Sequence, residues 1–360
     1  MTRERMYVSP AALREFATQI FERLGLPDGD AGTVAACLVS ANLRGLDSHG
    51  VSRIPIYAKR LRLGLVNPRP SLQVSRTAPG AVLVDGDNGM GMVVGTRAMA
   101  EALAIAREVG LGLAGVRRST HYGMAASYVL QAIAAGQIGF AFTNSSPGMA
   151  PYGGSKPVLG VNPLAVGVPA GQRSPFVLDM AMSIIARGKM RLAAMQGESI
   201  PEGLGLDREG QPTTNGMQVF GGGTVLPFGE AKGSGLAVWM EIMAGVLTGA
   251  AFAGEMRSLY EDFSGPQAIG HLFLAIRPDL FMSREEFARR MDTMIERFKD
   301  AEPAPGVDEV LMPGEPEERQ AARRACTGIP MAPEIVALLR REAEELGVPF
   351  PAASPTPLAL

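Results

Sequence analysis

The chain has 360 residues, 46% hydrophobic and 19% charged, with a formal net charge of −2 at pH 7; this is enough for two globular domains and gives no sign of a nucleic-acid partner. Its two cysteines, Cys37 and Cys326, have no metal-ligand spacing, so we expect neither a disulfide scaffold nor a metal site. No apolar run approaches the roughly 18 residues of a membrane span, and the charged amino terminus lacks the apolar core of a secretory signal. We therefore expect a cytoplasmic protein without membrane contact.

The first part of the chain, residues 1–76, is predicted to be helical. Ser9, followed by a proline, is typical of a helix cap, and the apolar residues after it recur at helical spacing. Residues 31–43 show a similar pattern. A third helix is expected over 54–64, with Ser52 as its cap.

Residues 77–283 alternate between strand-like and helical segments, which is an α/β pattern. The strand-like runs are 81–84, 111–116, 138–143, 175–178 and 270–276, and the helical runs are 96–109, 124–135 and 236–247. This region is predicted to form a separate sheet domain.

Helices return over residues 284–347, where Ser283 opens a Ser-x-x-Glu capping box. After a connection rich in proline and acidic residues, further helices are expected from Glu315 and from Pro333. The tail 348–360 holds four prolines and little to bury. We predict that it is extended or disordered.

The segment Leu46–Arg53 carries the strongest chemical signal. It places His49, Arg53 and Ser48 beside Gly50, in a chain with only three histidines. Histidine titrates near neutral pH, and the planar fork of arginine can hold a carboxylate in two parallel hydrogen bonds. The pattern predicts an acid/base group next to a binding site for a small carboxylic acid. The structural alternative is a helix-capping loop in which the histidine packs locally.

A second histidine, His121, follows a predicted strand and precedes a predicted helix. A helix amino terminus lowers the pKa of an imidazole and offers free N–H groups to an anion. His121 is therefore a candidate for binding a carboxylate or a cofactor phosphate, or for acting as a base, and a purely structural role is equally compatible. His271 lies inside a predicted strand and is interpreted as structural.

The segment Gly89–Gly95 resembles a dinucleotide fingerprint whose last glycine comes one place late. Asp85 and Asp87 just before it would repel a pyrophosphate, and Arg117 and Arg118 stand where such a fold needs an acidic residue. We interpret the segment as a glycine-rich turn and expect no classical Rossmann fold.

Three later loops, 143–154, 159–163 and 226–235, are rich in glycine and proline, which lets the backbone approach a ligand. Lys232 just precedes a predicted helix and could meet a phosphate there, although the order Lys-Gly-Ser is not that of a P-loop. These loops indicate a nucleotide ligand of unspecified kind.

Taken in order, these segments resemble the malate/L-lactate dehydrogenase family of non-Rossmann NAD(P)-dependent oxidoreductases over nearly the whole chain. The motifs that carry the resemblance are Asp47–Gly50 with Arg53, Ser119–Gly123, Thr143–Ser145, Asn162–Pro163, Leu178–Ala181, Lys232–Leu236 and Pro313–Glu315. The resemblance implies an α/β (α+β) fold, in which a helical domain from both chain ends, 1–76 and 284–347, joins a central NAD(P)-binding domain, 77–283, with a mostly antiparallel sheet. It also implies NAD or NADP as cofactor and a homodimer.

The resemblance further implies roles for individual residues. His49 would be the proton donor and acceptor, with Ser48 in its relay, and His121 is the alternative base. Arg53 would hold the substrate carboxylate, and Tyr57 and Ser145 would also lie on the substrate side. The expected cofactor contacts are His121, Tyr122, Gly123, Val177, Leu178, Asp179, Met180, Ala181, Ala231, Lys232, Pro313, Gly314 and Glu315.

The expected reaction is hydride transfer between NAD(P) and C2 of a small 2-hydroxy or 2-oxo carboxylic acid. The alternatives are a reductase of cyclic imines such as pyrroline- or piperideine-2-carboxylate, and a catalytically silent nucleotide-binding protein. Lys189 stands where the imine reductases look to carry a relay aspartate, which favours the dehydrogenase. Val161 replaces the threonine usual in the family before Asn162, so the substrate subclass stays open.

Overall fold

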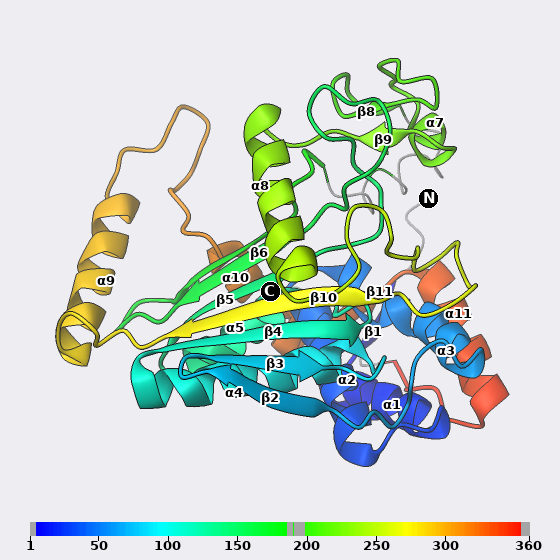
Figure 1. Ribbon diagram of the computed structural model, residues 1–360, viewed down its shortest axis with the longest axis horizontal. Helices are drawn as coiled ribbons and strands as arrows, with labels where there is room; N and C mark the ends of the chain where they lie inside the picture. Colours follow the sequence, from blue (N-terminus) through cyan, green and yellow to red (C-terminus); the bar gives the residue numbers. More distant parts are fainter. Residues whose placement is uncertain (1–4, 186–189, 191–198, 354–360) are drawn as a thin grey trace.

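The computed structural model describes residues 5–185, 190 and 199–353. A seven-stranded sheet with the order β2-β3-β4-β10-β5-β6-β7 forms its centre (Figure 1). The strands are β2 (Gln73–Ala78), β3 (Ala81–Asp85), β4 (Leu111–Ser119), β5 (Ile138–Thr143), β6 (Leu164–Val168), β7 (Phe176–Met180) and β10 (Ile269–Ile276). Strands β3 and β4 run parallel, and the other neighbouring pairs are antiparallel. The expected mostly antiparallel sheet is confirmed.

Two helices, α4 (Gly91–Val109) and α5 (Ala126–Ala134), cover one face of this sheet and bury apolar side chains against it. Helix α4 begins at Gly91, earlier than the predicted start at residue 96, because glycine allows a close approach there. A Cβ atom on Gly91 would lie 2.2 Å from the Thr120 carbonyl oxygen, and one on Gly95 would lie 2.7 Å from the Tyr128 ring. The segment Gly89–Gly95 thus serves helix packing.

The charged residues beside that segment pair with one another. Asp85 lies 2.7 Å from the Nε atom of Arg118 and 3.3 Å from that of Arg117. The two arginines that stand where a Rossmann fold needs an acidic residue are therefore partners of an aspartate on β3.

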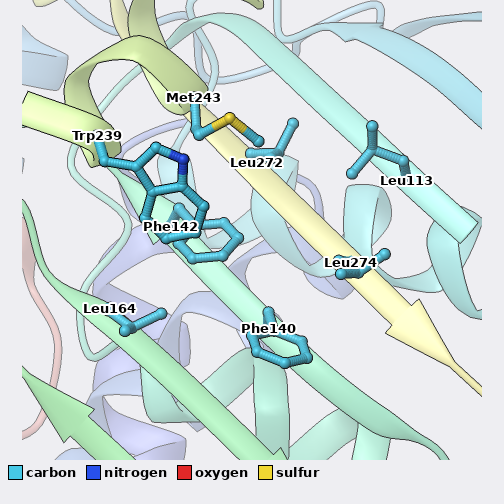
Figure 2. A pocket seen from close by; sticks show the side chains of 8 residues that line it. All are labelled: Leu113, Phe140, Phe142, Leu164, Trp239, Met243, Leu272 and Leu274. Carbon is cyan, nitrogen blue, oxygen red and sulfur yellow. The ribbon is translucent and has the colours of Figure 1, made fainter. Parts of the chain in front are cut away.

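On the other face of the sheet, helix α8 (Ala231–Glu241) continues into the π-helical η3 (Ile242–Val246). These segments leave an apolar groove along the strands, shown in Figure 2. The groove is lined by Leu113, Phe140, Phe142, Leu164, Trp239, Met243, Leu272 and Leu274. The indole of Trp239 stands against Phe142, and 43% of Trp239 is exposed.

The helical region joins the two ends of the chain. Helices α1 (Pro10–Arg23), α2 (Asp28–Leu43), α3 (Ile54–Arg62) and α11 (Pro333–Leu346) share one apolar core, and β1 (Met6–Val8) pairs antiparallel with β11 (Ile329–Met331). Ser9 caps α1, as predicted. Ser52 does not cap α3: Arg53 occupies that position, and the Ser52 hydroxyl instead donates to the Asp47 carbonyl at 2.7 Å.

The remaining elements lie at the edges of the molecule. Helix α10 (Glu315–Thr327) packs on α2, and a small sheet of β8 (Gly205–Leu206) and β9 (Thr224–Val225) lies near α7 (Gly216–Phe220). Helix α9 (Arg284–Lys299) stands at the far end of the central sheet (Figure 1). Its predicted cap is confirmed, because the Ser283 oxygen accepts from the Glu286 N–H at 3.1 Å.

The described part of the tail, residues 348–353, is extended but packed. Val348 is buried, and the Phe350 ring meets Phe16 edge to face at 5.4 Å. The expectation that the tail has little to bury is therefore wrong for these residues, because α1 offers an apolar surface to them. Within the described residues, no helix is both long and apolar enough to cross a membrane. The domain boundaries after residues 76, 283 and 347 stay predictions.

Candidate active site

The strongest sequence motif forms two consecutive 3₁₀ turns, η1 (Asp47–His49) and η2 (Val51–Arg53), between α2 and α3. Asn42, buried on α2, accepts from the Val51 N–H at 2.9 Å and donates to the Asp47 carboxylate at 2.6 Å. A Cβ atom on Gly50 would lie only 2.1 Å from the Asn42 side-chain oxygen. Glycine is therefore required for the motif loop to seat on α2.

The structure brings together the two histidines singled out from the sequence. The His49 ring, on η1, and the His121 ring, just after β4, are stacked with centroids 5.9 Å apart and planes 17° apart. Tyr57, buried on α3, places its hydroxyl oxygen 2.7 Å from Nδ1 of His121. Three side chains predicted to belong to one site thus form one contact cluster.

Hydrogen bonds define which nitrogen of a neutral His121 carries the proton. The backbone N–H of Gly123, which can only donate, points at Nδ1 of His121 at 3.3 Å, and Nδ1 must therefore accept. A neutral His121 accordingly carries its proton on Nε2. Ser48 places its hydroxyl 3.1 Å from Nδ1 of His49, and Nε2 of His49 has no hydrogen-bond partner within the described residues.

Burial and nearby charge keep both imidazoles neutral. Desolvation, with the positive charge of Arg53, lowers the pKa of His49 to about 4. The same causes, together with His49, hold the pKa of His121 well below its ordinary value. Burial raises the pKa of the Tyr57 phenol, so this group is protonated and can donate. The pair can thus accept a proton at neutral pH.

Two of the contacts that Arg53 makes bear on its orientation. Its Nε donates to the Ser48 carbonyl at 2.6 Å, and its guanidinium lies over the Tyr260 ring at 5.2 Å. The first contact ties the cation to the same turn as His49. The predicted carboxylate-binding group and the predicted acid/base group are therefore joined through one short hydrogen-bonded turn.

Ser145 lies in a neighbouring buried network. Its N–H donates to the Asn162 side chain at 3.0 Å, and Asn162 donates to the Glu241 carboxylate at 2.7 Å. Burial raises the pKa of Glu241. This network ties two of the predicted loops to α8. Val161, beside Asn162, packs against an apolar cluster instead of presenting a hydroxyl.

The segments predicted to contact a cofactor meet in pairs. The Val177 N–H on β7 donates to the Pro313 carbonyl at 3.0 Å, and Gly314, with φ +93°, packs so closely that a Cβ atom there would lie 2.7 Å from Cβ of Val177. Asp179 accepts from the Ala126 N–H at 2.8 Å, at the start of α5. Desolvation raises the pKa of the Asp179 carboxyl group to about 6.

Two buried polar atoms near Asp179 lack partners within the described residues: Nε of Arg44 and the Tyr122 hydroxyl. Buried groups of this kind are nearly always satisfied in proteins, so they fit a polar ligand at this place. The Tyr122 ring itself is buried and stacks on His271 at 4.6 Å. His271 lies in β10, as predicted, between the hydroxyls of Thr143 and Ser119.

Other predicted positions are less connected to the histidine pair. Lys232 is exposed in the first turn of α8, and within the described residues it makes no hydrogen bond to that pair. The Glu315 carboxylate accepts from Lys299 at 2.8 Å and also pairs with Arg319. Lys189 lies outside the described residues.

Sequence reasoning missed three residues that hold the site. Gln267 accepts from the His121 N–H at 3.2 Å, Asn42 supports the motif loop, and Arg324 on α10 pairs with Asp47 at 2.7 Å. A polar residue in the apolar pattern of residues 31–43 was a signal for Asn42. The exposed Arg323 and buried Arg324 look alike in the sequence, and no signal separates them.

Comparison with known proteins shows to which family the chain belongs. The model for malate/L-lactate dehydrogenases matches residues 8–340. L-sulfolactate dehydrogenase from Methanocaldococcus jannaschii is 37% identical over 346 residues, covering 95% of this chain and 98% of that protein. The solved structure of sulfolactate dehydrogenase from that organism superposes with a TM-score of 0.89, covering 95% of this chain and 98% of the other.

Two further relatives are named with their cofactors. Ureidoglycolate dehydrogenase (NAD(+)) from Escherichia coli strain K12 is 32% identical over 338 residues, covering 94% of this chain and 96% of that protein. (2R)-3-sulfolactate dehydrogenase (NADP(+)) from Chromohalobacter salexigens is 37% identical over 273 residues, covering 75% and 81%.

Proposed function

The chain belongs to the malate/L-lactate dehydrogenase family, and we propose that it is an NAD(P)-dependent oxidoreductase that interconverts a small 2-hydroxy acid and the corresponding 2-oxo acid. The observation that carries the proposal is the stacked pair of neutral imidazoles, His49 and His121, with Arg53 on the turn of His49. This set combines a proton acceptor with a group suited to a carboxylate.

The cofactor NAD or NADP, when bound, accepts or supplies the hydride at C2 of the substrate. We assign its binding to the β7 segment with Asp179, to the Pro313–Glu315 turn docked on Val177, to the backbone at Tyr122 and Gly123, and to Lys232. The Nε atom of Arg44 and the hydroxyl of Tyr122, which find no partner in the described part of the chain, support a polar ligand near Asp179. The Glu315 carboxylate is paired with Lys299 and Arg319. The backbone of that turn is therefore the part available to contact the cofactor.

His49 is the proposed proton carrier. Its Nε2 has no hydrogen-bond partner within the described residues, and the Ser48 hydroxyl stands at the other ring nitrogen. In the oxidative direction, neutral His49 takes the proton of the substrate hydroxyl, and in the reductive direction the imidazolium returns it. Neutral His121 carries its proton on Nε2 and can donate a hydrogen bond from there. It is the alternative acid/base.

Arg53 is the proposed carboxylate ligand, and it couples substrate binding to the protonation of His49. The positive charge of Arg53 helps to lower the pKa of His49 in the free protein. A substrate carboxylate bound to Arg53 would offset this charge and raise the pKa of His49. Binding of a 2-oxo acid would therefore favour the imidazolium needed for its reduction.

We propose a homodimer in which a second copy covers the apolar groove of Figure 2. Trp239 in this groove is 43% exposed, and Val246 and Leu247, after α8, are 52% and 59% exposed. Exposed apolar side chains beside an apolar groove are typical of an interface. Sedimentation at micromolar concentration should give twice the chain mass, and Trp239→Lys should shift it toward a monomer.

A cytoplasmic location is proposed too, supported by the nicotinamide cofactor and by two cysteines that form no disulfide.

The function is tested by following reduced-nicotinamide absorbance with a panel of 2-hydroxy acids and both oxidised cofactors. We expect turnover with at least one small 2-hydroxy acid that carries a free C1 carboxylate, and none with its amide. Turnover of the amide at an equal rate would remove the carboxylate from the account.

A further inference from the structure

Helix α10 connects two parts of the site at its opposite ends. At its start, the Pro313 carbonyl and Gly314 dock on Val177 of β7. Near its end, Arg324 reaches the Asp47 carboxylate with Nη1 at 2.7 Å and Nη2 at 3.1 Å. Arg324 lies ten residues after Gly314, so these two contacts are about 15 Å apart along the helix.

The contact of Arg324 with Asp47 orients the carboxylate and adds little to stability. Its side chain is 9% exposed, whereas that of its partner Asp47 is 49% exposed. A half-exposed ion pair contributes little to stability. Two parallel hydrogen bonds from a planar guanidinium nevertheless fix the direction of a carboxylate, which a single ammonium cannot do.

Asp47 passes this constraint to the motif loop. Its carboxylate also accepts from Asn42 on α2, and Arg324 donates to the Asn42 carbonyl. The Asp47 carbonyl accepts from the Ser52 hydroxyl at 2.7 Å, which closes the turn around Ser48 and His49. The two anchors of the loop, Asn42 and Arg324, thus meet at one carboxylate two positions before His49.

We propose that Arg324 is a positioning residue: through Asp47 it fixes the turn that carries His49, and α10 thereby links the β7 strand to the proton-transfer loop. The proposal rests on the proposed function only for the role of His49. Its first test therefore observes the His49 ring directly and needs no turnover.

The first measurement is NMR titration of the histidine rings in the apo protein labelled with ¹³C-histidine. The chain has three histidines, and single variants assign each signal. The charged and titratable groups near His49 are Arg53, His121 with its partner Tyr57, and Asp47, two positions earlier in the chain. Arg324→Met leaves the Asp47 charge without its partner and loosens the turn, so we expect the pKa of His49 to rise toward its ordinary value.

The matched control is Arg323→Met, which removes an exposed guanidinium from the neighbouring position of α10, where it bonds to Gln320. We expect no change in the His49 titration for this variant. Arg324→Lys should give a smaller rise in the His49 pKa than Arg324→Met, since it keeps the charge and loses the fork.

The second measurement separates positioning from folding. In folded Arg324→Met, we expect kcat to fall by on the order of 10²-fold, because a misplaced acid/base group loses this much, while the dissociation constant of NADH stays within about twofold. The kcat of Asp47→Asn, and that of the double variant Arg324→Met/Asp47→Asn, should fall by the same factor as that of Arg324→Met, because both substitutions break the same contact.

An unchanged His49 titration in folded Arg324→Met would overturn the proposal, as would multiplying kcat losses in the double variant. If Arg324→Met does not fold, the His49 titration of Arg324→Lys and the kcat of Asp47→Asn decide instead, because Asp47→Asn removes the charge that would raise the His49 pKa. If Arg324→Met shifts the His49 titration but the wild-type protein turns over no 2-hydroxy acid, the role of Arg324 is supported and the proposed function is wrong.

Discussion

The imidazole rings of His49 and His121 are stacked with their centroids 5.9 Å apart, although they come from different segments of the chain. His49 lies on a 3₁₀ turn of the helical region, and His121 lies just after β4 of the central sheet. Each has a different set of partners: Ser48 for His49, and Tyr57 with the Gly123 N–H for His121. Their roles can therefore be separated by mutation.

Replacing His49 by alanine should lower kcat by 10²–10⁴-fold, the range typical of general acid/base catalysis, and leave cofactor binding intact. His121→Ala is made in parallel, and NADH binding is followed by fluorescence in both. If His121→Ala abolishes turnover while His49→Ala keeps at least about a third of it, the two roles are reversed.

Arg53→Lys should chiefly lower kcat/KM for the carboxylate substrate, because an ammonium cannot reproduce a bidentate fork. The structure strengthens this expectation, since the Arg53 Nε atom is already held by the Ser48 carbonyl at 2.6 Å. The measurement is steady-state kinetics with the best acid substrate, and Lys59→Ala, at an exposed position of the following helix α3, is the control. An unchanged kcat/KM in Arg53→Lys would show that Arg53 does not bind the carboxylate.

Gly50→Ala should damage both the fold and the site, because its Cβ atom would lie 2.1 Å from the Asn42 side-chain oxygen. We expect the free energy of unfolding to fall by roughly 1–3 kcal/mol, as for other overpacked positions, together with kcat. Gly32→Ala on α2 is the control, because nothing lies within 4 Å of its Cβ position. That variant should raise stability by roughly 0.5–1 kcal/mol, as removal of a helical glycine does. Urea unfolding gives the free energy of unfolding of both variants, and an equal change in Gly50→Ala and Gly32→Ala would contradict the account.

Burial of His271 predicts a dependence of stability on pH. Its pKa is lowered from 6.5 to about 3, so below pH 6.5 the unfolded chain binds a proton that the folded chain does not. The contribution of His271 to stability is therefore present above pH 6.5 and is lost as the pH falls. Between pH 7.5 and pH 5.0 this loss amounts to about 2 kcal/mol.

The comparison of wild type with His271→Asn isolates this contribution from those of Asp179 and Glu241, whose raised pKa values act in the opposite direction. The difference in unfolding free energy between the two proteins should shrink by about 2 kcal/mol from pH 7.5 to pH 5.0. A difference that stays constant would mean that His271 is not buried as a neutral group.

Local patterns predicted most of the elements. The alternation after residue 77 and the caps at Ser9 and Ser283 depend on neighbours in the chain, and the structure confirms them. The start of α4 and the cap of α3 were misplaced. Gly91 enters a helix because the Thr120 carbonyl comes close to it, and Ser52 turns back to the Asp47 carbonyl. Both depend on contacts that spacing alone does not contain.

The same distinction holds for the site. His49 and Arg53 could be singled out because few residue types do their chemistry, and both lie on one short turn. Arg324 could not, since only the docking of α10 on α2 brings its guanidinium to Asp47. A sequence shows which groups can react more readily than it shows which groups hold them in place.

The measurement that tests the central claim most directly is a competition between 2-oxo acids and cyclic imines. Pyruvate-like 2-oxo acids are compared with pyrroline- and piperideine-2-carboxylate at matched concentrations, with NADH and with NADPH, and kcat/KM is determined for each. The account predicts that the highest kcat/KM belongs to a 2-oxo acid. A kcat/KM for either imine that exceeds every 2-oxo acid by more than about tenfold, well over 1 kcal/mol in transition-state binding, would contradict it.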